Sequence, residues 1–170
     1  AYFGTVYPHE RQCSEAVELP GGTPTEKAEF RDNLIADIAK VEQGMKIALI
    51  GVVNPLIAAI RKRGGTCLPC DLQMERTHWG DPVEKDMEKV LDSADGVICT
   101  GMTLSNGTFD RVIERVLERS IPLTVYAQTG SAVAARFVGA GITSLVAEPF
   151  PFSQFSANAT RVFCYRGQGD

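Results

Sequence analysis

Hydroxyl and amide side chains are concentrated in one segment, Thr100–Thr108, between an apolar run and a strongly amphipathic stretch. Five side chains in this segment carry a hydroxyl or amide group, and two further positions are glycine. Small polar side chains near free backbone N–H groups can hold a carboxylate, a phosphate or a polar ring. Capping the following helix needs only one such residue, so we interpret the segment as a ligand-facing loop. Its candidate binding residues are Thr100, Gly101, Thr103, Asn106, Gly107 and Thr108.

Two further loops repeat this design, because each follows a short apolar run and precedes a helical pattern. The carboxyl ends of parallel strands meet at one edge of a sheet, where ligands bind in open α/β folds. We therefore expect the three loops to form one polar pocket. The candidates in these two loops are Gly51, Asn54, Pro55, Thr129 and Ser131.

A C-x-x-C pair, Cys67 and Cys70, stands directly before Asp71. Such a pair can bind a metal or carry out redox chemistry. Residues i and i+3 of an extended strand point to opposite faces, so the two thiols meet only if Pro69 bends the chain. No second C-x-x-C completes a four-ligand zinc site. The cofactor stays open, and the candidate ligands of a divalent metal ion are Cys67, Cys70 and Asp71.

The candidate catalytic groups are Asp71 as a base and His78, which lies in a polar loop that could cover the pocket. Neither has an evident partner in the sequence. The hydrolase motif G-x-S-x-G and the phosphate-binding motif G-x-x-x-x-G-K-[ST] are absent. The dinucleotide motif G-x-G-x-x-G is also incomplete, since Val53 and Leu56 occupy two of its glycine positions. Asp71 follows Gly51 by 20 residues, close to the usual offset of a ribose-binding acid.

Short apolar runs alternate with amphipathic stretches from Lys46 onward, which is typical of βαβ units. This pattern predicts a Rossmann-like, three-layer α/β domain over residues 45–170, with a mostly parallel sheet of five to six strands. Residues 1–44 are predicted to be an N-terminal extension followed by a helix, which is capped by Thr25 and ends at Gly44. Helices are also expected at residues 55–63, 83–93 and 109–117, and a short one at 132–138.

Composition excludes several classes of protein. The chain has 170 residues and a formal charge of −4, without the basic balance that general nucleic-acid binding requires. No run approaches the roughly 20 apolar residues of a membrane span. The five cysteines are odd in number and sparse, and no basic-then-apolar leader opens the sequence. We therefore expect a cytoplasmic protein without disulfides.

The sequence resembles the putative heavy-metal chelation family over roughly residues 46–147. The most specific part is TGMTLSNGT at 100–108, which is similar to the family motif T-G-x-T-L-x-N-G-T, followed by the run NPLI at 54–57. This resemblance implies a Rossmann-like domain of unknown function. An enolase-N-terminal-like domain often precedes that domain in the family, so residues 1–44 are expected to be its remnant or a shortened replacement. The turn at 128–130 departs from the family's Gly-Pro-Thr-like sequence.

Three functions are compatible with these features. The first is binding of a small polar ligand or metal chelate, in cofactor or metallophore metabolism. The second is an enzyme, such as a lyase, isomerase or group-transfer enzyme, that acts on a small polar substrate in the same pocket. The third is a subunit, in a homo-oligomer or with a partner chain, whose site is completed by the other chain.

Overall fold

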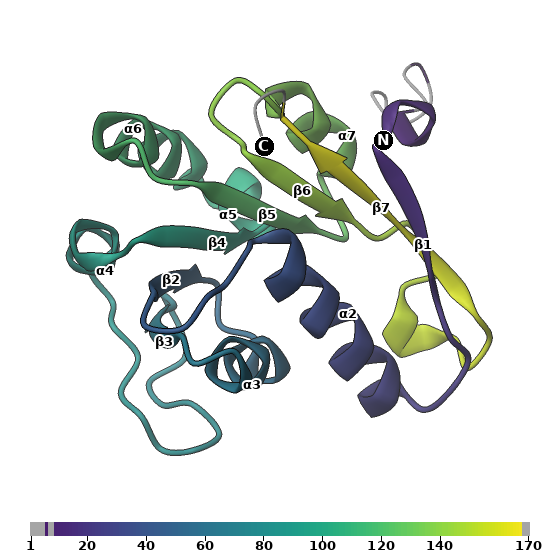
Figure 1. Cartoon of the computed structure of the whole chain (residues 1–170), viewed down its shortest axis with the longest axis horizontal. Helices are drawn as coiled ribbons and strands as arrows, with labels where there is room; N and C mark the ends of the chain where they lie inside the picture. The colour runs from purple at the N-terminus through teal and green to yellow at the C-terminus, as the bar shows by residue number, and fades with distance from the viewer. Residues whose placement is uncertain (1–5, 7–8, 168–170) are drawn as a thin grey trace.

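A seven-stranded sheet organises the protein (Figure 1). The computed structural model describes Val6 and residues 9–167, so residues 1–5 and 7–8 of the expected extension lie outside the described residues. The α/β fold with a mostly parallel sheet is confirmed, with one strand more than the expected five to six. The strands lie in the order β1-β7-β6-β5-β4-β2-β3. They are β1 (Glu15–Leu19), β2 (Lys46–Ile50), β3 (Thr66–Cys70), β4 (Gly96–Thr100), β5 (Leu123–Ala127), β6 (Ser144–Ala147) and β7 (Thr160–Arg166).

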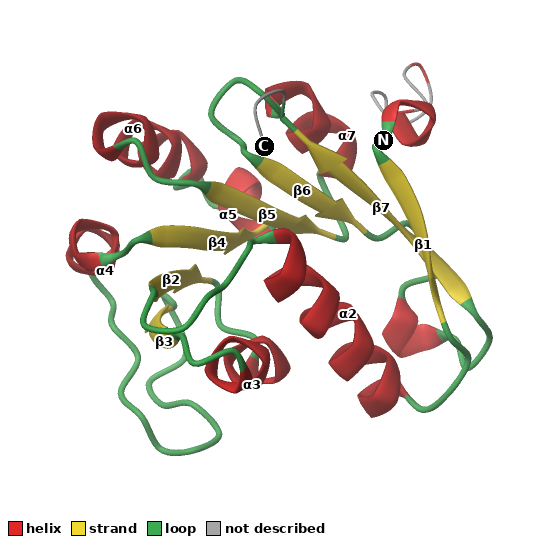
Figure 2. Ribbon diagram, in the orientation of Figure 1, coloured by secondary structure: helices red, strands yellow, loops and turns green. Residues whose placement is uncertain are grey.

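Helices cover both faces of the sheet (Figure 2). One face is covered by the helices α4 (Met87–Ser93), α6 (Phe109–Arg119) and α7 (Ser131–Ala134). The other face is covered by the helices α2 (Pro24–Ile38) and α3 (Asn54–Lys62). Burial on both faces explains why β2, β4, β5 and β6 are nearly continuous apolar runs. Among the described residues, no helix has both the length and the apolar character needed to span a bilayer. The remaining short elements are α5 (Met102–Ser105) and 3-10 turns at His9–Gln12, Ala135–Phe137 and Ser153–Phe155.

The strands β2 to β6 are parallel, and β7 runs antiparallel to both of its neighbours, β6 and β1. The strand that the sequence does not predict is β1, which lies within the segment expected to be an extension. Its burial is low except at Leu19, which is fully buried. Charged residues at Glu15 and Glu18 mask its strand pattern, as is common for a strand at the edge of a sheet.

The opposite edge of the sheet is β3, which carries Pro69 as its fourth residue and pairs with β2 on one side. The carbonyl of Pro69 faces away from β2 and accepts a hydrogen bond from Glu84 N. Proline cannot donate a hydrogen bond to a strand ladder, and is therefore tolerated in an edge strand. A single parallel bridge between Cys70 and Glu84 lies beside the end of this strand.

The boundaries of two helices differ from the sequence prediction. Helix α2 is capped by Thr23 rather than Thr25, because the Thr23 side chain accepts from Glu26 N while the Glu26 carboxylate accepts from Thr23 N. It ends at Ile38, before the predicted Gly44, and Lys40 adopts a positive φ of 51°. Helix α4 begins at Met87 rather than at residue 83, and Asp86 caps it.

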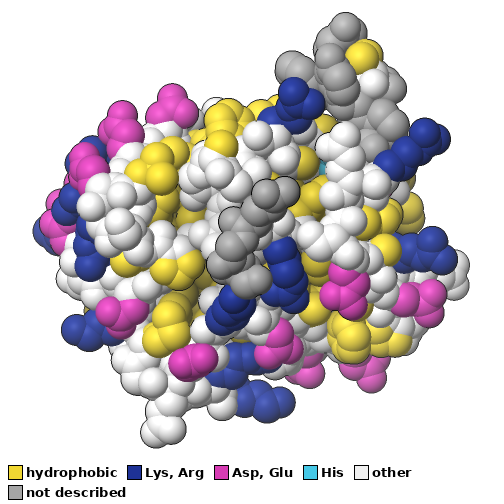
Figure 3. All heavy atoms as spheres, turned by 45° about the horizontal axis from the view of Figure 1, so that its top comes forward, with side chains coloured by type: hydrophobic (Ala, Val, Ile, Leu, Met, Phe, Trp, Pro, Cys, Tyr) yellow, Lys and Arg dark blue, Asp and Glu magenta, His cyan; other side chains and the backbone are white. Residues whose placement is uncertain are grey.

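Ion pairs join α4 to α6 on the surface of the molecule. The Arg111 guanidinium bonds both carboxylate oxygens of Glu88, at 2.7 and 2.8 Å, and Arg115 pairs with Asp92. Acidic and basic side chains are interspersed at the side of the molecule where these two helices lie (Figure 3). Charges of both signs therefore alternate over α4 and α6 instead of forming a continuous basic surface.

Replacement of Thr23 by alanine should lower the free energy of unfolding by about 1 kcal/mol, because the first turn of α2 loses its cap. The matched control is Thr25→Ala, two residues later in the first turn and also exposed, which should change stability little. Urea denaturation followed by circular dichroism measures both values. Equal losses in the two variants would contradict the assignment of Thr23 as the cap.

Candidate functional site

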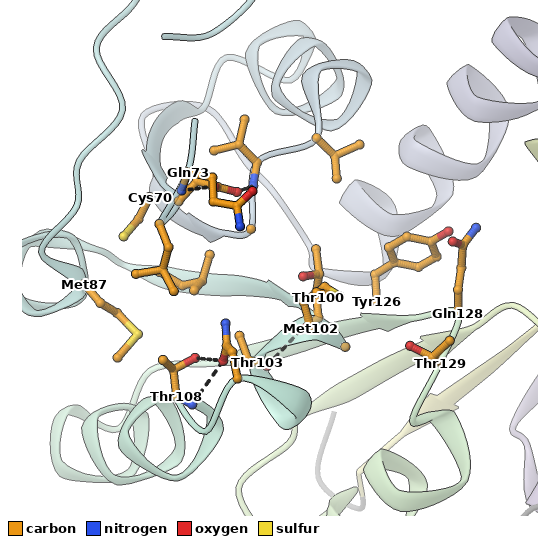
Figure 4. Close-up of a pocket in the computed structure, with 18 of the residues that line it drawn as sticks. Cys70, Gln73, Met87, Thr100, Met102, Thr103, Thr108, Tyr126, Gln128 and Thr129 are labelled. Atoms are coloured by element: carbon orange, nitrogen blue, oxygen red, sulfur yellow. Dashed lines mark hydrogen bonds between the residues drawn. The ribbon is translucent and has the colours of Figure 1, made fainter. Parts of the chain in front are cut away.

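A pocket of about 600 Å³ lies at the carboxyl ends of β2 to β5 (Figure 4). After β2 the chain moves to β3 on one side, and β4 then pairs with the other side of β2. This reversal of strand order is a topological switch point, where the loops that follow neighbouring strands diverge and leave a crevice. The pocket occupies this position.

Two glycines let the loops approach one another at the base of the pocket. Gly51 has a φ of +85°, and a Cβ there would lie 2.5 Å from Thr100 Oγ1. A Cβ on Gly101 would lie 2.6 Å from the carbonyl oxygen of Thr129. Any side chain at these positions would push apart the loops after β2, β4 and β5. The loops that were expected to converge are therefore in direct contact with one another.

The Asp71 carboxylate joins the loop after β3 to the loop after β2. Its Oδ2 accepts from Val52 N at 3.1 Å, and its Oδ1 accepts from Gln73 N at 2.8 Å and Met74 N at 3.0 Å. Burial opposes ionisation, but the three backbone N–H donors outweigh it and hold the pKa of Asp71 below its usual range. An ionised carboxylate that is already bound by three donors is a poor general base, so Asp71 is better suited to organising the loops.

Lys85 extends the same arrangement from the segment that precedes α4. Its Nζ donates to the carbonyl oxygens of Asp71, at 3.0 Å, and Met74, at 2.7 Å. An ammonium group has three N–H donors, so two of them fix the loop after β3 and one remains. Lys85 lines the pocket.

The loop after β4 presents several of the predicted polar groups. Asn106 Oδ1 accepts from Thr108 N at 3.2 Å and from Thr108 Oγ1 at 2.8 Å, which braces the start of α6. Thr103 is almost fully buried, and its hydroxyl donates to the Thr100 carbonyl at 2.8 Å. Thr103 therefore closes the turn, while the hydroxyl of Thr100 itself has no hydrogen-bond partner among the described residues.

The wall after β5 is held by a buried acid. Tyr126 Oη donates to Glu148 Oε2 at 2.5 Å, and Gln128 Nε2 donates to the same oxygen at 2.9 Å. Arg31 Nη1 lies 3.6 Å from it, and Ser153 N donates to Oε1. Burial disfavours the charge of Glu148, but these donors outweigh it and lower its pKa. Burial, with Glu148 nearby, raises the pKa of Tyr126 above its ordinary value.

The structure brings together most of the predicted binding residues but not all. The predicted residues that line the pocket are Gly51, Cys70, Asp71, Thr100, Gly101, Thr103, Asn106, Thr108 and Thr129. The predicted residues outside its lining are Asn54, Pro55, Cys67, His78, Gly107 and Ser131.

Those outside the lining have other contacts. Asn54 Oδ1 accepts from His78 N at 3.0 Å, so it anchors the loop that carries His78 instead of facing the pocket. The His78 ring stacks edge-on against Trp79. Ser131 Oγ lies 3.5 Å from Nε2 of His9, near the N-terminal end of the described chain.

Sequence reasoning missed several lining residues, including Val52, Lys85, Met87, Met102, Tyr126 and Gln128. Gln128 directly follows β5, so its position after a parallel strand was a usable signal. Lys85 precedes α4 and Met87 is its first residue, in the part of the chain that the sequence predicts to be helical from residue 83. No motif in the sequence indicates that this part of the chain returns to the pocket.

Comparison with known proteins identifies the family. The family model DUF364, described as putative heavy-metal chelation, matches residues 33–144. The chain belongs to this family. A search of curated proteins found no match.

Solved structures share the fold at low sequence identity. A protein of unknown function from the same family in Pyrococcus horikoshii superposes with a TM-score of 0.59 and 16% identity. The match covers 84% of this chain and 65% of that protein, so the chain spans less than two thirds of its relative. Cystalysin from Treponema denticola, which contains pyridoxal 5'-phosphate, has a TM-score of 0.57 and 12% identity, over 98% of this chain and 47% of its own. The methionine aminotransferase YbdL from Escherichia coli has a TM-score of 0.55 and 13% identity, and the match covers 88% of this chain and 41% of that protein.

The described residues do not fit a metal ion held by protein ligands alone. Among residues 9–167 there is no group of three or more His, Cys, Asp or Glu side chains placed to hold one. Cys70 packs with the α4/α6 side of the sheet and Cys67 with the α2/α3 side, because β3 stays regular through Pro69. The two thiols therefore point away from each other, as the i, i+3 spacing predicts for an unbent strand. Cys67, Cys70 and Asp71 therefore cannot bind the same metal ion.

Replacement of Asp71 by asparagine should destabilise the protein most at neutral pH. The folded-state pKa lies below the unfolded value, so the carboxylate contributes stability above the unfolded pKa of about 3.9 and loses it as the pH falls through the folded pKa. Urea denaturation over a series from pH 7 downward should show the gap between wild type and Asp71→Asn narrowing below about pH 4. Asp110→Asn, on the exposed start of α6, is the control. A gap that stays constant with pH would contradict this role for Asp71.

The C-x-x-C thiols should react slowly in the folded protein. Burial raises the pKa of Cys67 to about 12 and that of Cys70 to about 11, with the nearby Glu84 and Asp71 adding to the effect at Cys70. Tryptic peptide 64–76 contains both cysteines, so mass spectrometry after iodoacetamide treatment at pH 8 reports them together. We expect much slower labelling in native protein than in urea, where thiols have a pKa of about 8.5. Rapid native labelling, or stoichiometric metal that is lost in a Cys67→Ser/Cys70→Ser variant, would contradict this assignment.

Proposed function

We propose that this chain binds a small organic ligand, or a metal chelate supplied with its own organic ligand, in the pocket at the carboxyl ends of β2 to β5. The observation that carries the proposal is a pocket of about 600 Å³ at the switch point with polar groups left unused. This size lies within the roughly 300–1,000 Å³ that is typical of small-molecule sites. The hydroxyls of Thr100 and Thr129 have no hydrogen-bond partner among the described residues, and both line the pocket.

The lining supports an organic ligand more than a bare ion. Apolar side chains such as Val52, Met87 and Met102 make up much of the wall, and a few polar groups stand among them. That mixture is typical of sites that bury most of a small molecule and fix its orientation with a few hydrogen bonds. A bare metal ion would instead need several charged or imidazole ligands at one point.

The family description favours a chelate as one form of this ligand. In a chelate the organic molecule supplies the donors to the metal, so the protein needs only to recognise the outer surface of the complex. This division of roles agrees with the described residues, in which no cluster of three metal-ligating side chains is present. The same pocket can take the organic molecule without its metal.

A pocket-filling variant tests the proposal. Thr129 is exposed, has an unpartnered hydroxyl and lines the pocket, so Thr129→Trp should reduce the pocket volume without disturbing the core. Saturation-transfer NMR on a mixture of small organic fragments should show binding to the wild type that falls at least several-fold in this variant.

The matched control is Thr25→Trp, an exposed threonine on α2 outside the pocket lining, which should bind as the wild type does. Mass spectrometry of a denatured extract of the purified protein searches for a retained ligand at the same time. Fragment binding that is equal in both variants would contradict the proposed site.

A further inference from the structure

We infer that the ligand of this pocket is an organic carboxylate, with its carboxylate group placed against Asn106 and Lys85 and its apolar body against the methionines. The inference rests on the proposed function, because it names the chemical class that the same pocket takes. It follows from which hydrogen-bonding groups are already used and which remain. The protein thereby determines both the class of ligand and its orientation.

The amide orientation of Asn106 is fixed by its partner. Thr108 N carries a hydrogen and can only donate, so the Asn106 atom that faces it must be the carbonyl oxygen Oδ1. Thr108 Oγ1 donates to the same oxygen. The amide nitrogen Nδ2 therefore points elsewhere, and neither of its two N–H donors has a partner among the described residues. Asn106 lines the pocket, to which it contributes donors alone.

Lys85 adds a positively charged donor to the same lining. Two of its three N–H groups are used by the carbonyls of Asp71 and Met74, which hold the ammonium in place. The acidic group in the lining, Asp71, is already compensated by three backbone N–H donors. Lys85 and Asn106 both line the pocket and both keep donors for a ligand carboxylate, and such charge-assisted hydrogen bonds are about twice as strong as neutral ones.

The opposite polarity is found at Gln128, on the loop after β5 (Figure 4). The ionised Glu148 carboxylate can only accept, so the Gln128 atom that faces it must be Nε2. The second Nε2 hydrogen is donated to Gln154 Oε1 at 2.7 Å. Gln128 Oε1 accepts from Gln154 Nε2 at 3.2 Å, so the capacity that Gln128 has left for a ligand is the second lone pair of this oxygen, an acceptor. A carboxylate is therefore disfavoured at this end, and a hydroxyl or N–H group of the ligand fits there.

Apolar side chains also line the pocket. Met87 lies at the start of α4 on the side of Thr108, and Met102 of α5 lies near Thr100 (Figure 4), while Val52 lies on the loop after β2. Methionine side chains adapt to irregular shapes and make favourable contacts with aromatic rings. An aromatic carboxylate with an N–H or hydroxyl group at its far end matches all three regions.

Three probes with one ring system and different head groups test the inference: indole-3-acetate, indole-3-acetamide and tryptamine. Their dissociation constants are measured by titration with ligand-observed NMR. We expect the carboxylate to bind roughly tenfold or more tightly than the amide, and the amine to bind least, since a hydrogen bond to a charged group is worth about 1.5–3 kcal/mol, equivalent to about tenfold or more.

The decisive variant is Asn106→Asp, which keeps Oδ1 for Thr108 and replaces the donor nitrogen by a negatively charged oxygen. It should weaken indole-3-acetate binding by at least tenfold and leave tryptamine binding equal or stronger. Ser105→Ala, the exposed neighbour outside the pocket lining, is the control and should bind as the wild type does. Lys85→Gln gives a second reading if Asn106→Asp changes the circular dichroism spectrum, and it should also weaken the carboxylate selectively.

The possible outcomes separate the two claims. Preference for the amide or the amine, or an unchanged affinity for indole-3-acetate in both Asn106→Asp and Lys85→Gln, overturns the carboxylate inference while the pocket remains a binding site. Absence of binding by all three probes, together with equal fragment binding in Thr129→Trp and Thr25→Trp, overturns the proposed function and the inference with it.

Discussion

The structure depends on the close contact of three loops at the point where the strand order reverses. Gly51 meets the side chain of Thr100, and Gly101 meets the backbone of Thr129, at separations that leave no room for a Cβ atom. This steric constraint determines how the ends of β2, β4 and β5 lie relative to one another, and hence the shape of the pocket above them. Protein interiors are packed as densely as crystals, so the loops cannot slide past one another without opening the sheet below.

Polar side chains hold these loops in the close arrangement that the glycines make possible. Asp71 and Lys85 hold the loop after β3 from opposite sides, through backbone N–H groups and backbone carbonyls respectively. Glu148 performs the same task at the other end, where it holds Tyr126 and Gln128. Charged residues at this site therefore organise the backbone, and Glu148 also orients the amide of Gln128 in the pocket lining. A charged residue in a pocket is often interpreted as a catalytic group, but here its hydrogen bonds assign it a positioning role.

The layered fold could be predicted from the sequence because apolar runs and helical periodicity repeat along residues 46–147. The edge strand β1 could not, since Glu15 and Glu18 conceal its pattern and its partner β7 lies far along the chain. The cap at Thr23 was missed because Pro24 separates it from the apolar stripe, although proline is favoured at the first helical position. Both features depend on an interaction that local periodicity does not reveal, namely the pairing of β1 with β7 and the hydrogen bonds between Thr23 and Glu26.

The polar loops after β2, β4 and β5 could be predicted as a group from their positions after parallel strands. The roles of single residues could not, because a role depends on which partner has already used a donor or acceptor. Thr103 and Thr100 have the same side chain, yet the hydroxyl of Thr103 closes a turn while that of Thr100 stays unpartnered. Lys85 was expected within a helix at residues 83–93, and only the three-dimensional structure shows that it lines the pocket.

The free edge of β3 has a consequence for self-association. In a strand, the N–H and C=O of every second residue face the same side, and on β3 the outward side is that of Cys67, Pro69 and Asp71. Pro69 has no N–H, its carbonyl is taken by Glu84 N, and Asp71 N donates to Glu84 O. An incoming strand would find only Cys67 with both groups available, whereas an open edge normally offers a full row. The Glu84 backbone thus leaves β3 little capacity to pair with a strand of a neighbouring molecule.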